Sequence, residues 1–159
     1  METSAIQGDN SRMDAQNWRI LVVDDRFKFG ETVRDIATLF GCTTHLALNL
    51  SAAVHQLIHW EPHLILLDLH LPPDEWEPVP ALQTKYDPTQ RSLALCEQIT
   101  SHPRFQNITV CIVTVDDQPQ QRMLANQAGA HFFWTKSEFG ADALEVTLRH
   151  VQAATQPDQ

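Results

Sequence analysis

The sequence predicts a doubly wound α/β domain, in which a five-stranded parallel sheet carries helices on both faces. Several short runs of Val, Ile and Leu lack polar alternation, which is typical of parallel strands buried on both faces. Strand-like and helix-like segments alternate five times and are joined mostly by short connections. At 159 residues, the chain is long enough to bury a substantial core in one domain.

The first strand and helix are defined by a change of hydrophobic period. Residues 18–25 (WRILVVDD) form the first strand, which ends at two acids. Residues 27–40 follow with apolar side chains at helical spacing, and Gly41 stands where a helix stop is expected. The positions predicted to face inward on this helix are Val33, Ile36, Ala37 and Phe40.

The second strand, the second helix and the third strand follow in order. Residues 43–48 (TTHLAL) are rich in β-prone types. Ser51 is predicted to cap the next helix, which cannot continue past Pro62. Residues 64–68 (LILLD) are apolar enough for a central strand. The predicted inward positions of the helix are Ala53, Val54, Leu57 and Ile58.

The third helix, the fourth strand and the fourth helix complete the centre of the domain. Apolar positions within 93–99 mark a helix, and residues 108–114 (ITVCIVT) form another central strand. Residues 118–127 are predicted to form a short helix that ends before Gly129.

The fifth strand is predicted at 130–134 (AHFFW), and the last helix at 137–154. Apolar positions on that helix are Leu144, Val146, Leu148 and Val151. The folded domain should therefore span 18–154, with a flexible N-terminal tail at 1–17 and a short C-terminal tail at 155–159.

The charge balance excludes several classes of partner. The chain has 11 Lys and Arg against 20 Asp and Glu, a formal net charge of −9. Nucleic acid and acidic membranes should repel such a chain. The sequence also lacks the continuous apolar run of a signal peptide or a membrane span. We expect a cytoplasmic protein with no direct nucleic-acid or membrane binding.

Polar residues close the predicted strands. Asp24 and Asp25 end the first, Asp68 ends the third, Thr114 ends the fourth, and Lys136 follows the fifth. Because the carboxyl ends of parallel strands share one edge of a sheet, these side chains should meet there. Each residue alone has an ordinary explanation as a cap, turn former or surface charge. Together, three carboxylates, a hydroxyl and an ammonium suit a divalent cation and a phosphoryl group.

The same segments resemble a known family. LVVDD, LILLDLHLP, IVT and GAHFFWTK are similar, in order and position, to the strand-end motifs of the receiver domain of bacterial two-component response regulators. This likeness covers about 18–154 and implies the flavodoxin-like receiver fold. It also implies that Asp68 accepts a phosphoryl group from a sensor histidine kinase or a histidine phosphotransfer protein.

The resemblance implies roles for the other strand-end residues. Asp25, Asp68 and the backbone carbonyl of His70 would bind Mg²⁺ directly, and Asp24 would act through a water. Mg²⁺ prefers octahedral oxygen ligation and keeps several waters, which fits this set.

The remaining roles concern the phosphoryl group and the switch. Thr114 would contact the phosphoryl oxygens and Lys136 would pair with them. Phe133 aligns with the switching aromatic residue of the family, often a tyrosine, and cannot donate a hydroxyl hydrogen bond.

Two departures from the family pattern bear on these roles. Ser137 stands where the family usually has proline, so a cis peptide there would cost about 3 kcal/mol and Lys136 would be presented differently. Val115 replaces a smaller residue and should narrow access for donors and water, giving slow phosphorylation and a long-lived phosphoryl form.

A long insertion at about 72–90 is the largest departure. It contains several prolines and acids and exceeds the length at which loops are ordinary connections. Two interpretations remain open: the segment lids the site or presents Trp76 and Tyr86 to a partner, or it is a mobile excursion without a dedicated role.

The sequence predicts a single-domain response regulator receiver that signals through a downstream protein. It would not be an enzyme with a separate substrate, but a phosphoacceptor that assists its own phosphorylation and dephosphorylation. The alternative is a pseudo-receiver that binds proteins without phosphorylation. A Mg²⁺-dependent phosphatase is a weaker alternative, because the haloacid dehalogenase type needs an acid where this chain has His70.

Overall fold

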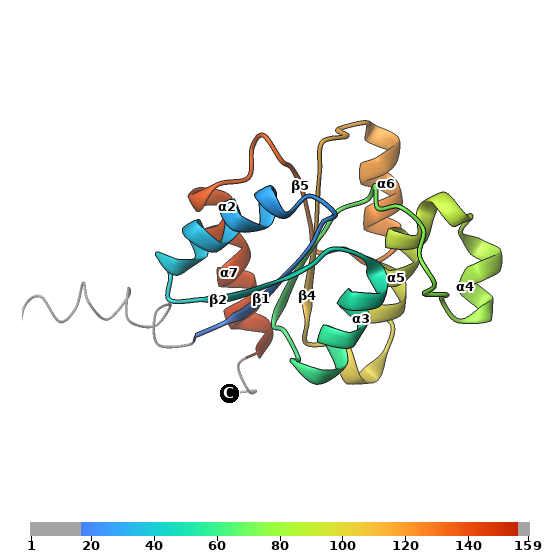
Figure 1. The fold of residues 1–159 in the computed structure, drawn as a ribbon, viewed down its shortest axis with the longest axis horizontal. Coiled ribbons are helices and arrows are strands. Elements are labelled where there is room, and N and C mark those ends of the chain that lie inside the picture. Colours follow the sequence, from blue (N-terminus) through green and yellow to red (C-terminus); the bar gives the residue numbers. More distant parts are fainter. Residues whose placement is uncertain (1–16, 156–159) are drawn as a thin grey trace, which may run out of the picture.

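The computed structural model describes residues 17–155 and contains one five-stranded sheet in the order β2-β1-β3-β4-β5, with every pair parallel (Figure 1). This confirms the predicted fold class. Nearly all of the predicted tails, 1–17 and 155–159, lies outside the described residues. The strands are β1 (Arg19–Val23), β2 (Thr43–Ala47), β3 (Leu64–Leu67), β4 (Thr109–Thr114) and β5 (Phe132–Thr135).

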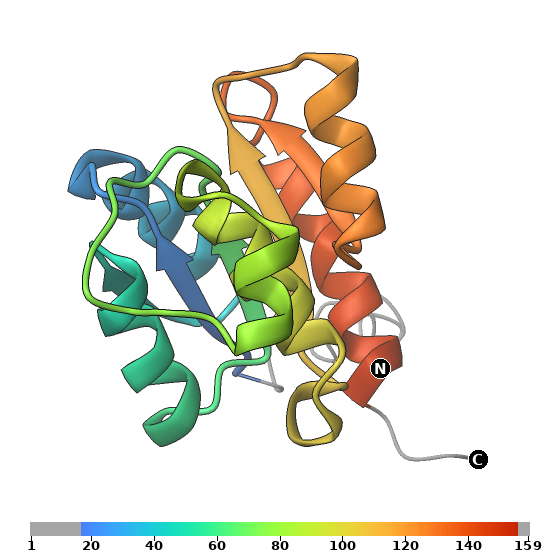
Figure 2. The same cartoon turned by 90° about the vertical axis from the view of Figure 1, so that its right-hand side faces the viewer.

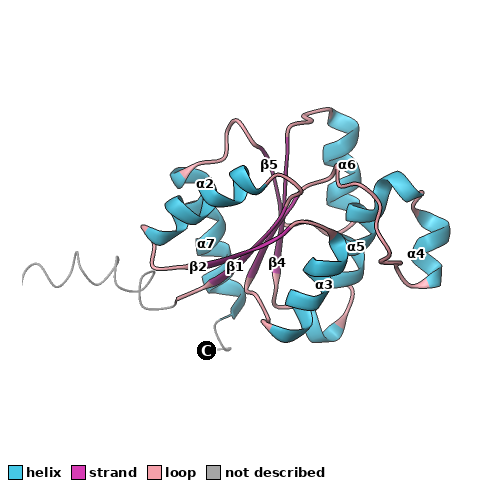
Figure 3. Cartoon of the chain, viewed as in Figure 1, coloured by secondary structure: helices cyan, strands magenta, loops and turns pink. Residues whose placement is uncertain are grey.

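Helices cover both faces of the sheet (Figure 3). One face packs against α2 (Phe27–Thr38) and α7 (Ala141–Thr155). The opposite face packs against α3 (Leu50–His59), α5 (Arg91–Thr100) and α6 (Pro119–Gln127). No helix within residues 17–155 is long and apolar enough to cross a membrane.

The β1 side chains show why the strand sequences lack polar alternation. Leu21 and Val23 enter the core under α3 and α5, whereas Ile20 and Val22 enter the core under α2 and α7. All four are at most 1% exposed. A strand that buries both of its faces must be apolar at every position.

The helix ends agree with the sequence prediction at the glycines and differ from it at one cap. Gly41 and Gly129 have φ angles of 73° and 95°, the left-handed conformation that glycine adopts without strain. The predicted cap Ser51 is wrong. Asn49 caps α3 instead, since its side-chain oxygen accepts the Ala52 N–H at 2.8 Å.

One predicted inward position and some predicted boundaries are also wrong. Ile58 on α3 is 40% exposed, so it lies off the buried face of its helix, and Val146, an apolar position of α7, is 49% exposed. The fifth strand runs over Phe132–Thr135 rather than 130–134. The last helix begins at Ala141 rather than at 137. The residues before it form a turn, and Phe139 of this turn is buried. A residue predicted to be helical therefore packs against the core from a loop.

The insertion is folded onto the domain. It contains α4 (Pro80–Lys85) and a 3₁₀ turn, η1 (Pro88–Gln90), and α4 lies outside α5 (Figures 1 and 2). Leu82 and Tyr86 are buried, and Trp76 packs partly buried against the core. Tyr86 is therefore not available to a partner in this arrangement, whereas Trp76 keeps part of its surface exposed.

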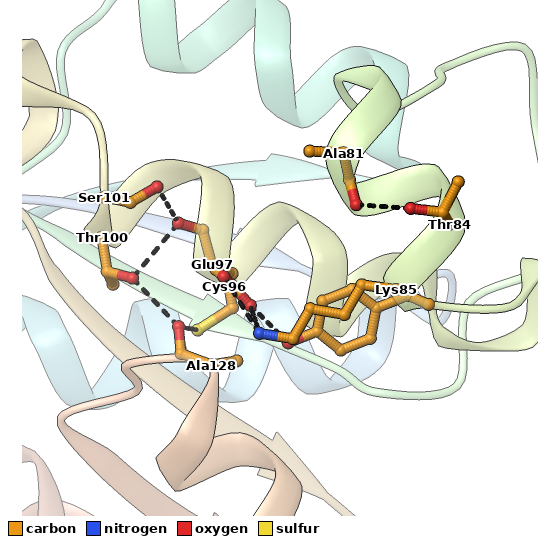
Figure 4. A network of polar contacts seen from close by, with 9 residues as sticks. Ala81, Thr84, Lys85, Cys96, Glu97, Thr100, Ser101 and Ala128 are labelled. Atoms are coloured by element: carbon orange, nitrogen blue, oxygen red, sulfur yellow. Dashed lines mark hydrogen bonds and ion pairs between the residues drawn. The ribbon is translucent and has the colours of Figure 1, made fainter.

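Polar contacts around Glu97 of α5 hold the insertion in place. The Tyr86 hydroxyl donates to Glu97 Oε1 at 2.7 Å, and the Lys85 ammonium lies 2.9 Å from the same oxygen (Figure 4). Burial and the Glu97 carboxylate raise the pKa of Tyr86, so its hydroxyl keeps its proton. On the other side of the segment, the Asp74 carboxylate accepts the Ser51 N–H at the start of α3.

Candidate functional site

Asp24 and Asp68 lie side by side because they end neighbouring strands. Val23 pairs with Leu67 in the last register position of β1 and β3. Backbone hydrogen bonds continue past the strands, with the Asp68 N–H donating to the Val23 carbonyl and the Asp24 N–H donating to the Ala47 carbonyl, each at 3.0 Å. The sheet therefore fixes the backbone positions from which both side chains extend.

Three carboxylates converge at this edge. Asp24, Asp25 and Asp68 each place a carboxylate oxygen within 4.8 Å of the others. Asp24 and Asp68 are 3% and 7% exposed, while Asp25 is exposed to solvent. Hard oxygen donors in a partly open cluster are suited to Mg²⁺, which keeps several of its waters. The donor chemistry thus fits the predicted metal site.

Lys136 enters the same pocket. Its ammonium lies 2.5 Å from Asp24 Oδ2 and 3.5 Å from Asp68 Oδ2, and its backbone N–H donates to the Thr114 carbonyl at 2.8 Å. Residues 17–155 contain no cis peptide bond, so Lys136 reaches both carboxylates from a trans linkage to Ser137. The expected change in its presentation does not keep it out of the pocket.

The environment of Asp68 raises the pKa of its carboxyl above the usual value. Burial is the largest cause, the Lys136 ammonium opposes it, and the Asp24 carboxylate adds to it. The His70 N–H also donates to Asp68 Oδ1 at 3.3 Å and favours the charged form. The charged form of Asp68 is therefore unfavourable in this environment, and a bound cation would stabilise it.

Thr114 is fully buried at the end of β4, the strand next to β3. Its hydroxyl oxygen accepts the Asp116 N–H at 3.4 Å. Val115, directly after it, is 74% exposed. The structure thus buries the Thr114 side chain at the end of β4 and leaves the adjacent branched side chain exposed to solvent.

A polar contact joins two loops next to the site. His70 Nε2 lies 3.4 Å from Asp116 Oδ2, which connects the loop after β3 to the loop after β4. From the sequence, His70 was expected to supply a backbone carbonyl and to lie near enough to Asp68 to affect access to it, whereas Asp116 was not predicted. The available signal was its place two residues after Thr114, the same offset that separates His70 from Asp68.

The end of the insertion borders a cavity beside the loop that follows β3. The cavity has a volume of about 240 Å³ and is lined by Leu69, His70, Thr89, Gln90, Leu93 and Gln121. The insertion therefore forms one wall of a space next to the residues that follow Asp68.

Phe133, the predicted switch residue, lies half-buried in β5 and packs against the core. The guanidinium carbon of Arg122 lies 4.7 Å from the centre of its ring, within the range of a cation–π contact. The sequence analysis missed Arg122, because no local pattern connects a residue on α6 with an aromatic ring on β5.

The comparisons with known proteins come from structure alone. No family model and no curated sequence matches the chain. A signal receiver domain of a signal transduction histidine kinase from Syntrophus aciditrophicus is 22% identical, with a TM-score of 0.69, 89% of this chain covered and 96% of that chain covered. A receiver domain of a DNA-binding response regulator from Colwellia psychrerythraea is 23% identical (TM-score 0.67, 87% and 99% covered). A response regulator receiver domain protein from Methanospirillum hungatei is 19% identical (TM-score 0.66, 86% and 95% covered).

Proposed function

We propose that this chain, which has the fold of signal receiver domains, accepts a phosphoryl group on Asp68 in a Mg²⁺-dependent reaction. The observation that carries the proposal is the pocket itself. The carboxylates of Asp24 and Asp25 and the ammonium of Lys136 lie beside Asp68 at the carboxyl edge of the sheet. The donor would be a phosphohistidine of a sensor kinase or of a phosphotransfer protein.

Asp25, Asp68 and the His70 carbonyl would hold Mg²⁺, with Asp24 acting through a water. Bound there, the cation would neutralise charge on the carboxylates and on the incoming phosphoryl oxygens. Asp24 Oδ2 is buried and already faces the Lys136 ammonium at 2.5 Å, which favours an indirect role through a water.

The residues of the chain would position and stabilise the transferred group. A bond forms between an Asp68 oxygen and phosphorus while the P–N bond of the donor breaks and releases its imidazole. Lys136 would shift from Asp24 toward the phosphoryl oxygens, and the Thr114 hydroxyl would donate to one of them. Positioning and charge stabilisation supply most of the catalysis in phosphoryl transfer.

Phosphorylation would then change the population of two conformations. Movement of Thr114 toward the phosphoryl group would draw the β4–α6 loop inward and permit Phe133 to repack. The surface formed by α6, β5 and α7 would change, and a downstream protein would read that change.

The test is Asp68-dependent phosphorylation. The full chain is incubated with Mg²⁺ and acetyl phosphate, or with Mg²⁺ and beryllofluoride, and compared with Asp68→Asn. The control Asp142→Asn removes an exposed carboxylate of α7. We expect labelling and a conformational response in the wild type and in Asp142→Asn, and neither in Asp68→Asn. Equal labelling of Asp68→Asn would overturn the proposal.

A second candidate, the phosphorylation-independent scaffold, is favoured by the folded insertion. Leu82 and Tyr86 build α4 into the domain, so this chain carries a structured surface next to α5 that could bind a protein without any switch. Absence of a response to both phosphoryl reagents would favour the scaffold. Rapid turnover of an unrelated phosphomonoester would instead favour the phosphatase.

A further inference from the structure

Arg122 connects three segments that flank the acceptor site. Its Nε and Nη2 lie 2.8 Å and 2.7 Å from Asp117 Oδ1, in the loop after β4. Its Nη2 also lies 3.7 Å from Glu138 Oε1, in the loop after β5. The same guanidinium covers the ring of Phe133, with 4.7 Å between its carbon and the ring centre. One side chain on α6 therefore contacts both loops and the switch aromatic.

These contacts lie close in sequence to the site residues. Asp117 is three residues after Thr114, Glu138 is two residues after Lys136, and Phe133 is three residues before Lys136. The Glu138 carboxylate is itself fixed, because its Oε1 accepts the Thr135 N–H at 2.8 Å. Displacement of either loop relative to α6 would alter at least one contact of Arg122.

The contacts are modest in strength but act together. Arg122, Asp117 and Glu138 have side chains between 43% and 58% exposed, so each ion pair is partly screened by water. The cation–π contact on the half-buried ring of Phe133 adds a contribution of similar size. Planar guanidinium suits this arrangement, because it stacks on the ring with its face and bonds carboxylates with its edge.

We propose that Arg122 is a positioning residue that holds Phe133 and the two loops in the unphosphorylated arrangement and so sets the threshold of the switch. The inference rests on the proposed function of Asp68 and concerns its regulation. A contact made in only one of two conformations stabilises that conformation by its full value. Loss of the Arg122 contacts should therefore increase the population of the activated arrangement.

The first test is a beryllofluoride titration of the full chain with saturating Mg²⁺, followed by the fluorescence of the tryptophans, one of which, Trp134, adjoins Phe133. Arg122→Gln should lower the midpoint about three- to tenfold, the change expected for loss of one cation–π contact and exposed ion pairs. The midpoint of Arg122→Lys, which keeps a cation over the ring, should lie between those of the wild type and Arg122→Gln.

The matched control is Arg149→Gln. Arg149 is an exposed arginine of α7 with an ion pair to Glu145 at 2.9 Å, so its loss changes the charge equally and breaks a similar pair away from Phe133. Its midpoint should equal that of the wild type. A midpoint for Arg122→Gln that is unchanged or higher would overturn the inference.

A second measurement separates this inference from the proposed function. Amide hydrogen exchange in the absence of phosphoryl reagents should be faster in the β4–α6 and β5–α7 loops of Arg122→Gln than in Arg149→Gln. If beryllofluoride causes no change in the wild type, both the proposed function and the threshold role of Arg122 are wrong. Faster exchange in Arg122→Gln would then show only that Arg122 stabilises the two loops. If the wild type responds and exchange is unchanged, the inference alone fails.

Discussion

Asp68 is the residue on which the proposed function depends, and it is unfavourable as a bare carboxylate. Burial and Asp24 raise its pKa, and Lys136 offsets this only in part. Such a group binds a proton or a cation to relieve its charge. The same conditions that destabilise the empty pocket would make it receptive to Mg²⁺ and to a phosphoryl group.

Asp68→Asn should therefore stabilise the metal-free protein at neutral pH. Removal of a buried charge beside Asp24 should raise the free energy of unfolding by on the order of 1 kcal/mol, because Lys136 still has Asp24 as a partner. Denaturant unfolding with EDTA measures this change, and Asp142→Asn is the control. A clear loss of stability in Asp68→Asn would contradict the electrostatic account of the pocket.

The raised pKa of Asp68 determines how the free energy of unfolding should change with pH. A carboxyl whose pKa is higher in the folded state than in the unfolded state stabilises the fold while it is protonated and loses that stabilisation as the pH rises. The stability difference between Asp68→Asn and the wild type should thus shrink as the pH falls from neutral toward the ordinary aspartate pKa of 3.8. A difference that grows toward acid would indicate that Asp68 is stabilised as the anion.

We expect Val115 to affect a different property, the lifetime of the phosphoryl form. The residue lies 74% exposed beside Thr114, where its branched side chain would shield an acyl phosphate from water. Val115→Ala should speed hydrolysis of the phosphoryl form several-fold, measured as the decay of labelled protein after donor removal. Val146→Ala, at an exposed valine of α7, should not change the rate. Slower or unchanged decay in Val115→Ala would refute the shielding role.

At the scale of elements, the insertion is an added layer on α5 and not a loose loop. Its fixed points are an apolar contact and a polar cluster, since Leu82 is buried and Glu97 receives both Tyr86 and Lys85. Its far end borders the cavity next to His70. The insertion is therefore in contact with α5 and borders the cavity beside the loop after β3.

Leu82→Ala tests whether α4 belongs to the cooperative fold. Truncation of a buried leucine at a peripheral helix should lower the free energy of unfolding by about 2 kcal/mol. Val79→Ala, at a 47% exposed position of the same segment, should change it by less than about 0.5 kcal/mol. Equal small effects of the two substitutions in denaturant unfolding would show that the insertion detaches without cost.

At the scale of the whole molecule, the fold was predictable because burial on both faces determines the sequence pattern of each central strand. Strands buried on both faces, such as β3 and β4, have uninterrupted apolar sequences, and the parallel topology brings the ends of those strands to one edge. Asp24, Asp68 and Lys136 could therefore be assigned to one pocket before any coordinates were known.

The features that escaped prediction depend on tertiary contacts. Helix α4 has only six residues, too few for a helical period to be recognised, and its position depends on Glu97 of another helix. Asp116 and Arg122 acquire their roles from His70 and Phe133, which are distant in sequence. Local patterns contain no information about such pairs.

The most direct test of the central claim identifies the atom that carries the phosphoryl group. The full chain is treated with acetyl phosphate and Mg²⁺ and then with borohydride, which reduces an acyl phosphate to the alcohol, and the peptides are examined by mass spectrometry. The account predicts homoserine at position 68, formed only when Mg²⁺ and the donor are both present. Unmodified aspartate at position 68, or reduction at another carboxylate, would contradict it.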